Sequence, residues 1–256
     1  MGQKVEVGGT VYDLKAGKCL VGGTAYALKK GRTLIGGTGY DISLLSGVPI
    51  DELTPGTPIY ITENNVATQF YIAKHDYESG LNGMGRTLLI RAHIVKNDVF
   101  GSNKFYDNST LDKYFNETYP SLFSGFVQSL MSNTSFPWKP GLYAQTTICT
   151  KKAFALSMTE YGLSGGYTPV EGTSLPIRGL FNAIALEAND NRLWSRTADF
   201  ETESTTSVSV LESYNGEIHA RSYYCYVSYG YLPAFSLPGE ALVSDNGDGT
   251  YTLVEE

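Results

Sequence analysis

Polar and apolar residues alternate in a repeating pattern over the first 45 residues. The segments VGGTVYDLKAGKCL, VGGTAYALKKGRTL and IGGTGYDISLLSGV begin at Val7, Val21 and Ile35, so the period is 14 residues. Within each unit, Thr, Tyr and Leu or Ile stand two apart, and such residues share one face of a strand. Glycine pairs mark tight turns. We therefore predict for residues 1–45 a small β-repeat module, with two short strands per unit in one thin sheet.

This repeat module is too small to bury much surface by itself. Repeats of this kind bury their faces by stacking on neighbours. Two interpretations stay open: a meander packed on the following domain, or an assembly module that docks on copies of itself or on a larger particle. In the second, Tyr12, Tyr26 and Tyr40 line the docking face. The prolines and glycines of residues 46–58 disfavour helix and central strand and predict a semi-rigid linker.

Residues 59–238 show the patterns of a larger domain with strands and two helices. IYIT, TQFYIAKHDY and RTLLIRAHIV have the composition of strands. Residues 107–132 have helical periodicity, with Asn108 or Ser109 as the N-cap. Pro120 is expected to break this stretch into two helices. After Ser132 we expect short strands joined by polar loops, and residues 239–256 predict a hairpin because they contain Asn-Gly and Asp-Gly turn dipeptides.

The segment RSYYCYVSYGYLPAF, from Arg221 to Phe235, is unusually rich in tyrosine. Strand alternation sends Tyr224 and Tyr226 to one face and Tyr223, Tyr229 and Tyr231, with Cys225, to the other. We predict that the second set is core and that the first is exposed.

The exposed set and the polar segments upstream have the composition of a binding surface, in which tyrosine supplies rigid contact area and Ser and Asn supply hydrogen bonds. The alternative is that they are ordinary solvent-facing strand positions. The predicted ligand-binding residues are Asn189, Asp190, Asn191, Tyr214, Asn215, Glu217, His219, Tyr224 and Tyr226.

Composition and charge narrow the function classes. The chain has 256 residues, 42% of them hydrophobic and 18% charged, with a net charge of -7. This balance suits a strand-rich domain and makes a nucleic-acid partner unexpected. No apolar run approaches the ~20 residues that span a bilayer, so we expect neither membrane insertion nor, from the N-terminus, a secretory leader.

Recognisable catalytic and metal-binding motifs are missing from the sequence. The three histidines, His75, His93 and His219, have no second ligand at a metal-binding spacing. There is no nucleophile elbow, phosphate-binding loop or dinucleotide fingerprint. The acids of DNGDG do not fit a calcium loop, and turn chemistry accounts for them. We therefore expect no metal, no cofactor and no enzymatic activity.

Five motifs occur in order along the chain: GRTLLIRAHIV, YDNSTLDKYFNETY, KKAFALSMTEYG, RLWSRT and GYLPAFSL. The series resembles a domain of unknown function common in bacteriophage and gut Firmicutes proteins, similar to the C-type-lectin-like fold of formylglycine-generating enzymes and phage variable proteins. The resemblance covers residues 59–238 and implies an α+β fold with two helices and a twisted antiparallel sheet, with Trp194 and Phe235 buried. One departure is YLPAF, where the family usually has VRPAF and therefore an arginine.

The resemblance also implies a function. The repeat module looks like the N-terminal segments of gut-phage structural proteins. The expectation is a virion protein at a tail tip or fibre, assembled in the host cytoplasm. Its expected partners are other virion proteins, copies of itself, with a trimer as the expected number, and a host-surface glycan or protein. One alternative is a ligand-free capsid decoration protein. Another is an enzyme of the formylglycine-generating type, with copper on Cys149 and Cys225, although both lie in segments typical of strand interiors.

Overall fold

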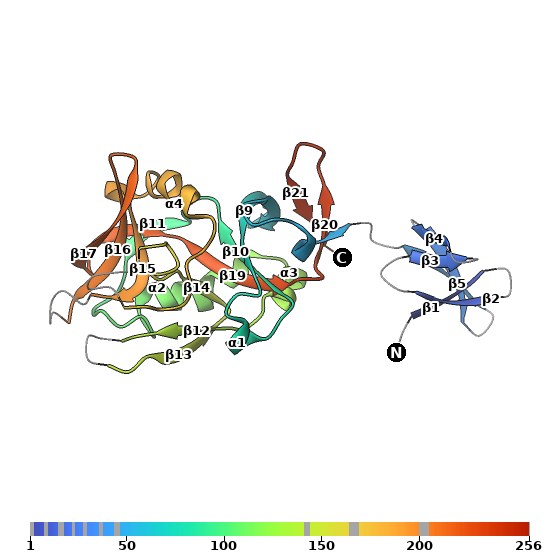
Figure 1. Cartoon of the computed structure of the whole chain (residues 1–256), viewed down its shortest axis with the longest axis horizontal. Coiled ribbons are helices and arrows are strands. Elements are labelled where there is room, and N and C mark those ends of the chain that lie inside the picture. The colour runs from blue at the N-terminus through green and yellow to red at the C-terminus, as the bar shows by residue number, and fades with distance from the viewer. Residues whose placement is uncertain are drawn as a thin grey trace. The chain divides into compact units, whose positions relative to one another are not determined.

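The protein divides into two compact units, Met1–Val48 and Pro49–Glu256. The computed structural model describes residues 47–140, 144–163, 169–199 and 205–255 with their side chains. Between residues 3 and 43 it describes the backbone of six strands. Figure 1 shows the first unit in dark blue and the second from light blue to red.

In the first unit, each repeat contributes a pairing of two short strands. The strands are β1 (Gln3–Val7), β2 (Thr10–Leu14), β3 (Lys18–Val21), β4 (Thr24–Ala27), β5 (Lys30–Ile35) and β6 (Thr38–Ser43). Val7 pairs with Thr10, Val21 with Thr24 and Ile35 with Thr38, so the 14-residue period recurs in the register. The expectation of one thin sheet is wrong, because the described strands form three separate two-stranded sheets. The side chains of Tyr12, Tyr26 and Tyr40 lie outside the described residues.

The larger sheet of the second unit has eight strands, in the order β14-β19-β10-β9-β8-β21-β20-β7. Their bounds are β7 (Val48–Pro49), β8 (Pro58–Glu63), β9 (Val66–His75), β10 (Arg86–Arg91), β14 (Ala153–Ala155), β19 (Pro233–Pro238), β20 (Leu242–Asp245) and β21 (Tyr251–Leu253). The C-terminal hairpin β20–β21 is present and joins this sheet through a parallel pairing of β21 with β8. It is therefore part of the domain.

The stretch predicted as a linker, residues 46–58, is packed against the second unit from Pro49 onward. Ile50 begins a short 3-10 helix (Ile50–Glu52) and is fully buried. Its backbone N–H donates to the Ala241 carbonyl at 2.9 Å. Prolines occur in irregular backbone that is packed against a domain as well as in free linkers. The proline pattern alone therefore could not distinguish the two, and the prediction of a linker was wrong from Pro49 onward.

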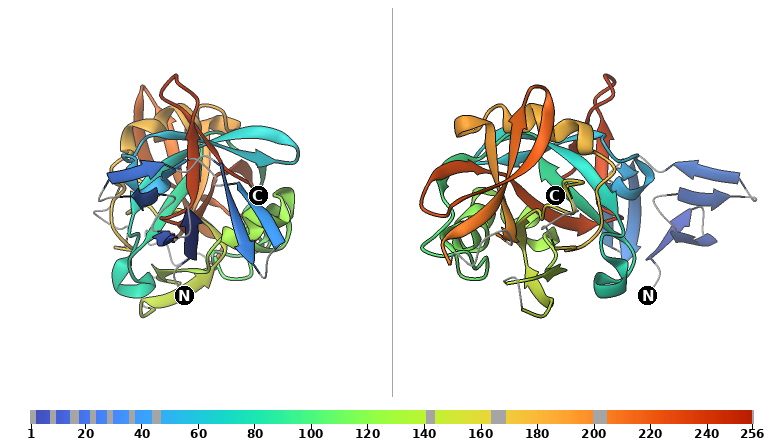
Figure 2. Two further views of the ribbon diagram at one scale, coloured as in Figure 1. Left: turned by 90° about the vertical axis from the view of Figure 1, so that its right-hand side faces the viewer. Right: turned by 60° about the vertical axis from the view of Figure 1, so that its left-hand side comes forward.

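The second sheet has five strands in the order β11-β18-β15-β16-β17. They are β11 (Lys96–Val99), β15 (Arg192–Ala198), β16 (Ser207–Tyr214), β17 (Glu217–Tyr224) and β18 (Ser228–Tyr231). The strands lie side by side and twist (Figure 1, Figure 2). A further hairpin pairs β12 (Thr134–Trp138) with β13 (Thr147–Lys151). The expected single antiparallel sheet is therefore replaced by two mixed sheets, because β15 also pairs with β18 in parallel.

Helices are short in the described residues. The α-helices are α1 (Ser79–Asn82), α2 (Thr110–Lys113), α3 (Gly125–Leu130) and α4 (Arg178–Ala185). Ser109 caps α2, since its hydroxyl accepts from the Asp112 N–H at 3.0 Å. The helix continues as a π-helix (Tyr114–Thr118) and a 3-10 helix (Tyr119–Leu122). Pro120 therefore lies in the 3-10 turn, and the break comes later, where Ser124 caps α3.

The fold class is α+β, as predicted, with strands dominating and more helices than the two expected. The prediction missed α4, a short amphipathic helix whose Phe181 and Ile184 are buried.

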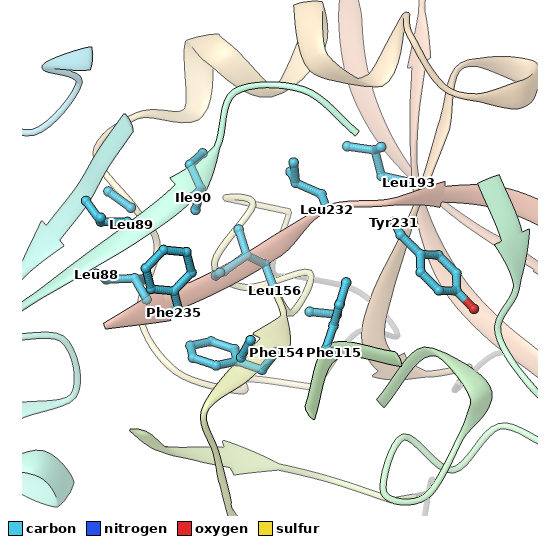
Figure 3. Close-up of a cluster of buried hydrophobic side chains, with 14 of the residues drawn as sticks. Leu88, Leu89, Ile90, Phe115, Phe154, Leu156, Leu193, Tyr231, Leu232 and Phe235 are labelled. Carbon is cyan, nitrogen blue, oxygen red and sulfur yellow. The ribbon is translucent and has the colours of Figure 1, made fainter. Parts of the chain in front are cut away.

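The core contains the aromatic residues of the sequence motifs. Trp194 and Phe235 are fully buried, which confirms that prediction. Phe235 lies near Leu88 and Phe154 in Figure 3. Leu232, at the position where the resemblance implied an arginine, is also buried. Gly230 is required by close approach: a Cβ there would lie 2.6 Å from the Ala188 Cβ.

Candidate functional site

The tyrosine segment spans the end of β17, a turn, all of β18 and the start of β19. β17 ends at Tyr224, the Cys225 N–H donates to the Thr206 carbonyl at 2.7 Å, and the Val227 N–H donates to the Tyr224 carbonyl at 3.0 Å. A turn thus separates β17 from β18, and the predicted continuous strand is wrong. The buried Cys225 anchors the turn and sends its neighbours outward.

Tyr224 and Tyr226, here called the tyrosine pair, are 54% and 61% exposed. Their rings stack with centroids 5.2 Å apart and an angle of 8° between the planes. Tyr229 and Tyr231 are buried, so the predicted division between outward and inward rings is confirmed for these four residues. Tyr223, predicted as core, is only half-buried, and its ring packs edge-on against Tyr229. The tyrosine pair thus offers solvent a preformed aromatic surface.

The loop between β11 and α2 is joined to this turn by backbone hydrogen bonds. The Gly101 N–H donates to the Cys225 carbonyl at 3.2 Å, and the Lys104 N–H donates to the Thr205 carbonyl at 2.9 Å. Phe105 on this loop is 42% exposed. It lines a cavity of about 280 Å³ with polar neighbours, among them Asn103 and Asp107. The sequence analysis did not single out this loop, although an exposed aromatic residue among Ser, Asn and Asp was a usable indication.

The predicted residues Tyr214, Asn215 and Glu217 lie at the other end of β17, at the tip of the β16–β17 hairpin. Seven strand steps separate Glu217 from Tyr224, or about 23 Å at roughly 3.3 Å per residue. The tip faces the start of α4 across an open cavity of about 450 Å³, which Glu217 and Arg178 help to line. These residues therefore do not share one site with the tyrosine pair.

The remaining predicted residues lie near a charged group on β15–β17. Asn189, Asp190 and Asn191 are exposed in a 3-10 turn before β15, and His219 lies opposite Glu212 in the strand register. Between them, Arg192 donates to Glu212 through Nε at 2.8 Å and through its terminal nitrogen at 2.6 Å.

The guanidinium of Arg192 also lies 4.1 Å from the centre of the Tyr223 ring, and Arg221 donates to Glu212 at 3.1 Å. Burial alone would raise the pKa of Glu212, but the bonds from the two arginines outweigh it and lower that pKa. The sequence analysis missed this network, because it depends on strand register and on no local motif.

A second charged group is fully enclosed and is built from the family-like motifs. Arg196 of RLWSRT donates to both carboxylate oxygens of Glu160 of SMTEYG, at 2.6 and 2.8 Å. Tyr77 donates a further short hydrogen bond to Glu160. Burial lowers the pKa of Arg196, but the Glu160 charge more than offsets it. Burial raises the pKa of the adjacent Glu171 to about 7. Because these side chains are buried, this part of the motifs contributes to the core and not to the exposed surface.

The cysteines that copper would need are buried thiols. Burial raises the pKa of both Cys149 and Cys225, which disfavours the thiolate that metal binding requires. Within the described part of the chain, no three His, Cys, Asp or Glu side chains are grouped to hold a metal. In the same residues, no helix is long and apolar enough to cross a membrane. In the DNGDG loop, Asp245 and Asp248 accept hydrogen bonds from Gly247 and Thr250, which is turn chemistry.

Comparison with known proteins gives one match. No curated protein and no solved structure matches the chain. The model of the family described as "Domain of unknown function (DUF6273)" matches residues 84–239, more than half of the chain and most of the second unit. The matched range holds the buried Glu160–Arg196 pair, the loop before α2 and the tyrosine pair. The chain belongs to the DUF6273 family.

Proposed function

We propose that this chain is a bacteriophage virion protein, at a tail tip or fibre, whose second unit attaches to the host surface through the tyrosine pair. The observation that carries the proposal is the exposure of two large rings, Tyr224 and Tyr226, which stack on each other. The turn that holds them is fixed by the buried Cys225 between them. Fixing two aromatic side chains in the free protein lowers the entropy lost on binding. Two solvent-facing tyrosines that bind no ligand gain nothing from being stacked in advance.

Two further features support the proposal. The division into two units suits a protein in which one part anchors and the other binds. The hairpin repeat resembles the N-terminal segments of phage structural proteins, so its proposed partners are copies of itself, as a trimer, and other virion proteins. The C-type-lectin-like fold is part of this proposal, and the twisted sheets, short helices and exposed loops of the second unit are compatible with it.

The proposed attachment is tested by cell binding of the purified chain. The double variant Tyr224→Ala/Tyr226→Ala removes the pair, and we expect binding to host cells to fall at least tenfold, because exposed aromatic anchors often dominate an interface. The melting temperature should hardly change, as is usual for surface substitutions.

The matched control is Tyr214→Ala, which removes an equally exposed tyrosine from the far end of the hairpin. It should bind cells like the unmodified chain. Loss of attachment in Tyr214→Ala alone would move the site to the hairpin tip. A chain that occupies the capsid and never binds cells would support the decoration alternative instead.

A further inference from the structure

The loop between β11 and α2 holds a polar cavity, and it begins at Gly101, whose N–H donates to the Cys225 carbonyl in the turn of the tyrosine pair. The cavity volume is about 280 Å³. The cavity lining that matters here is Ser102, Asn103, Phe105, Asp107, Asn108 and Lys113. The Lys104 N–H donates to the carbonyl of Thr205, the neighbour of the residue that accepts from Cys225, so backbone hydrogen bonds hold this loop beside the turn.

The loop is held in shape before any ligand arrives. Lys104 and Tyr106 on either side of Phe105 are buried, which forces the Phe105 ring outward. The side-chain oxygen of Asn103 accepts from the Phe105 N–H at 3.0 Å. Asp107 is fixed by Lys151 at 2.7 Å. The fixed polar groups beside one exposed ring can orient a small ligand, and the lining is more polar than that of most small-molecule sites.

The lining selects against most ligand classes. Asp107 and Lys113 carry opposite charges, and both line the cavity. The cavity therefore favours neither a strongly anionic nor a strongly cationic ligand. The amides of Asn103 and Asn108 can both donate and accept hydrogen bonds. An apolar ring beside such groups suits a ligand with an apolar C–H face and a rim of hydroxyls. The volume of about 280 Å³ lies just below the roughly 300–1,000 Å³ of drug-sized ligand sites and suits a ligand as small as one sugar ring.

We propose that this cavity binds one neutral pyranose residue of a host-surface glycan. Phe105 covers its C–H face, Asp107 accepts from its hydroxyls, and the tyrosine pair contacts the next residue of the glycan. The inference rests on the proposed attachment function and names its ligand. A protein receptor is the other class, but a concave polar cavity of this size contributes little to the ~800 Å² that each partner commonly buries in a protein interface.

The test measures binding of the purified full chain to methyl glycosides of glucose, galactose, mannose and N-acetylglucosamine by saturation-transfer NMR. At least one glycoside should bind saturably. Binding should weaken tenfold or more in Phe105→Ala and in Asp107→Asn, while Tyr214→Ala should leave it unchanged. Phe105 is exposed, so its variant should fold, and the melting temperature checks this.

The outcomes separate the two proposals. If no glycoside binds, or if Phe105→Ala binds as the unmodified chain does, the cavity is not a sugar site. If attachment to cells survives periodate oxidation of their glycans and is lost after protease treatment, the receptor is a protein: this overturns the sugar site and leaves the attachment function standing. If the chain binds a glycoside but never binds cells, the sugar site stands and the attachment function fails.

Discussion

Replacing Glu160 by Gln should destabilise the second unit by about 3–5 kcal/mol, the usual cost of removing one partner from a buried ion pair. Glu160 is fully buried and accepts both bonds from Arg196, one from the Ser157 N–H at 2.8 Å and one from Tyr77. Glutamine keeps the shape of the glutamate side chain but has no negative charge. Its NH2 group is a hydrogen-bond donor that would face the donor groups of the Arg196 guanidinium. Arg196 is then buried without its hydrogen-bonded counter-charge. For a domain stabilised by about 5–15 kcal/mol, this is a large fraction of the total.

The assay is urea unfolding followed by tyrosine and tryptophan fluorescence. Asp98→Asn is the matched control, because it removes an acid from a partly exposed pair with Lys96 and should cost at most about 1 kcal/mol. The double variant Glu160→Gln/Arg196→Met leaves no lone charge and should recover much of the loss. A change below about 1 kcal/mol in Glu160→Gln, or no recovery in the double variant, would refute the stabilising role assigned to this buried ion pair.

Three further predictions concern stability and assembly. The pKa of Glu171 is about 7 in the folded chain against 4.5 for a free carboxyl, so the folded state holds the proton longer and stability should fall as pH rises from about 4.5 to 7. Glu171→Gln should remove about 3 kcal/mol of this pH-dependent change in the free energy of unfolding, measured by urea titrations at several pH values. The same dependence of unfolding free energy on pH in Glu171→Gln and in the unmodified chain would contradict this prediction. Trp194→Ala or Phe235→Ala should each cost roughly 3–5 kcal/mol in the same melt, whereas a loss under about 1 kcal/mol is incompatible with their burial. A chain of residues 46–256 should fold but fail to oligomerise or to enter particles; sedimentation identical to the full chain would remove the assembly role from the repeat.

Local patterns predicted what depends on local spacing. The 14-residue period predicted strand pairs, and alternation predicted the outward direction of Tyr224, because side-chain direction follows directly from strand geometry. Tyr226 is exposed as predicted, although it lies in the turn after β17 and not in a strand. Ser109 was correctly offered as a helix cap, since capping acts within one turn.

Features that depend on pairing between residues far apart in the chain could not be predicted from local sequence patterns. Ile50 lies within a proline-rich stretch but is buried by contacts near Ala241, about 190 residues away. The Arg192–Glu212 pair exists only because β15 and β16 adopt one register. The residues predicted as one binding site lie in separate places. Glu217 and Tyr224 are close in sequence, but they lie at opposite ends of β17. The loop of Phe105, distant in sequence, is instead held beside the tyrosine turn by backbone hydrogen bonds from Gly101 to Cys225 and from Lys104 to Thr205.

The proposed role is tested most directly by locating the chain in an intact phage particle by electron microscopy. We predict density for this chain at the tail tip or fibre, with the turn at Cys225 facing outward and the repeat module turned toward the particle. Density on the capsid shell, or a particle without this chain, would contradict the proposal that it attaches the virion to its host.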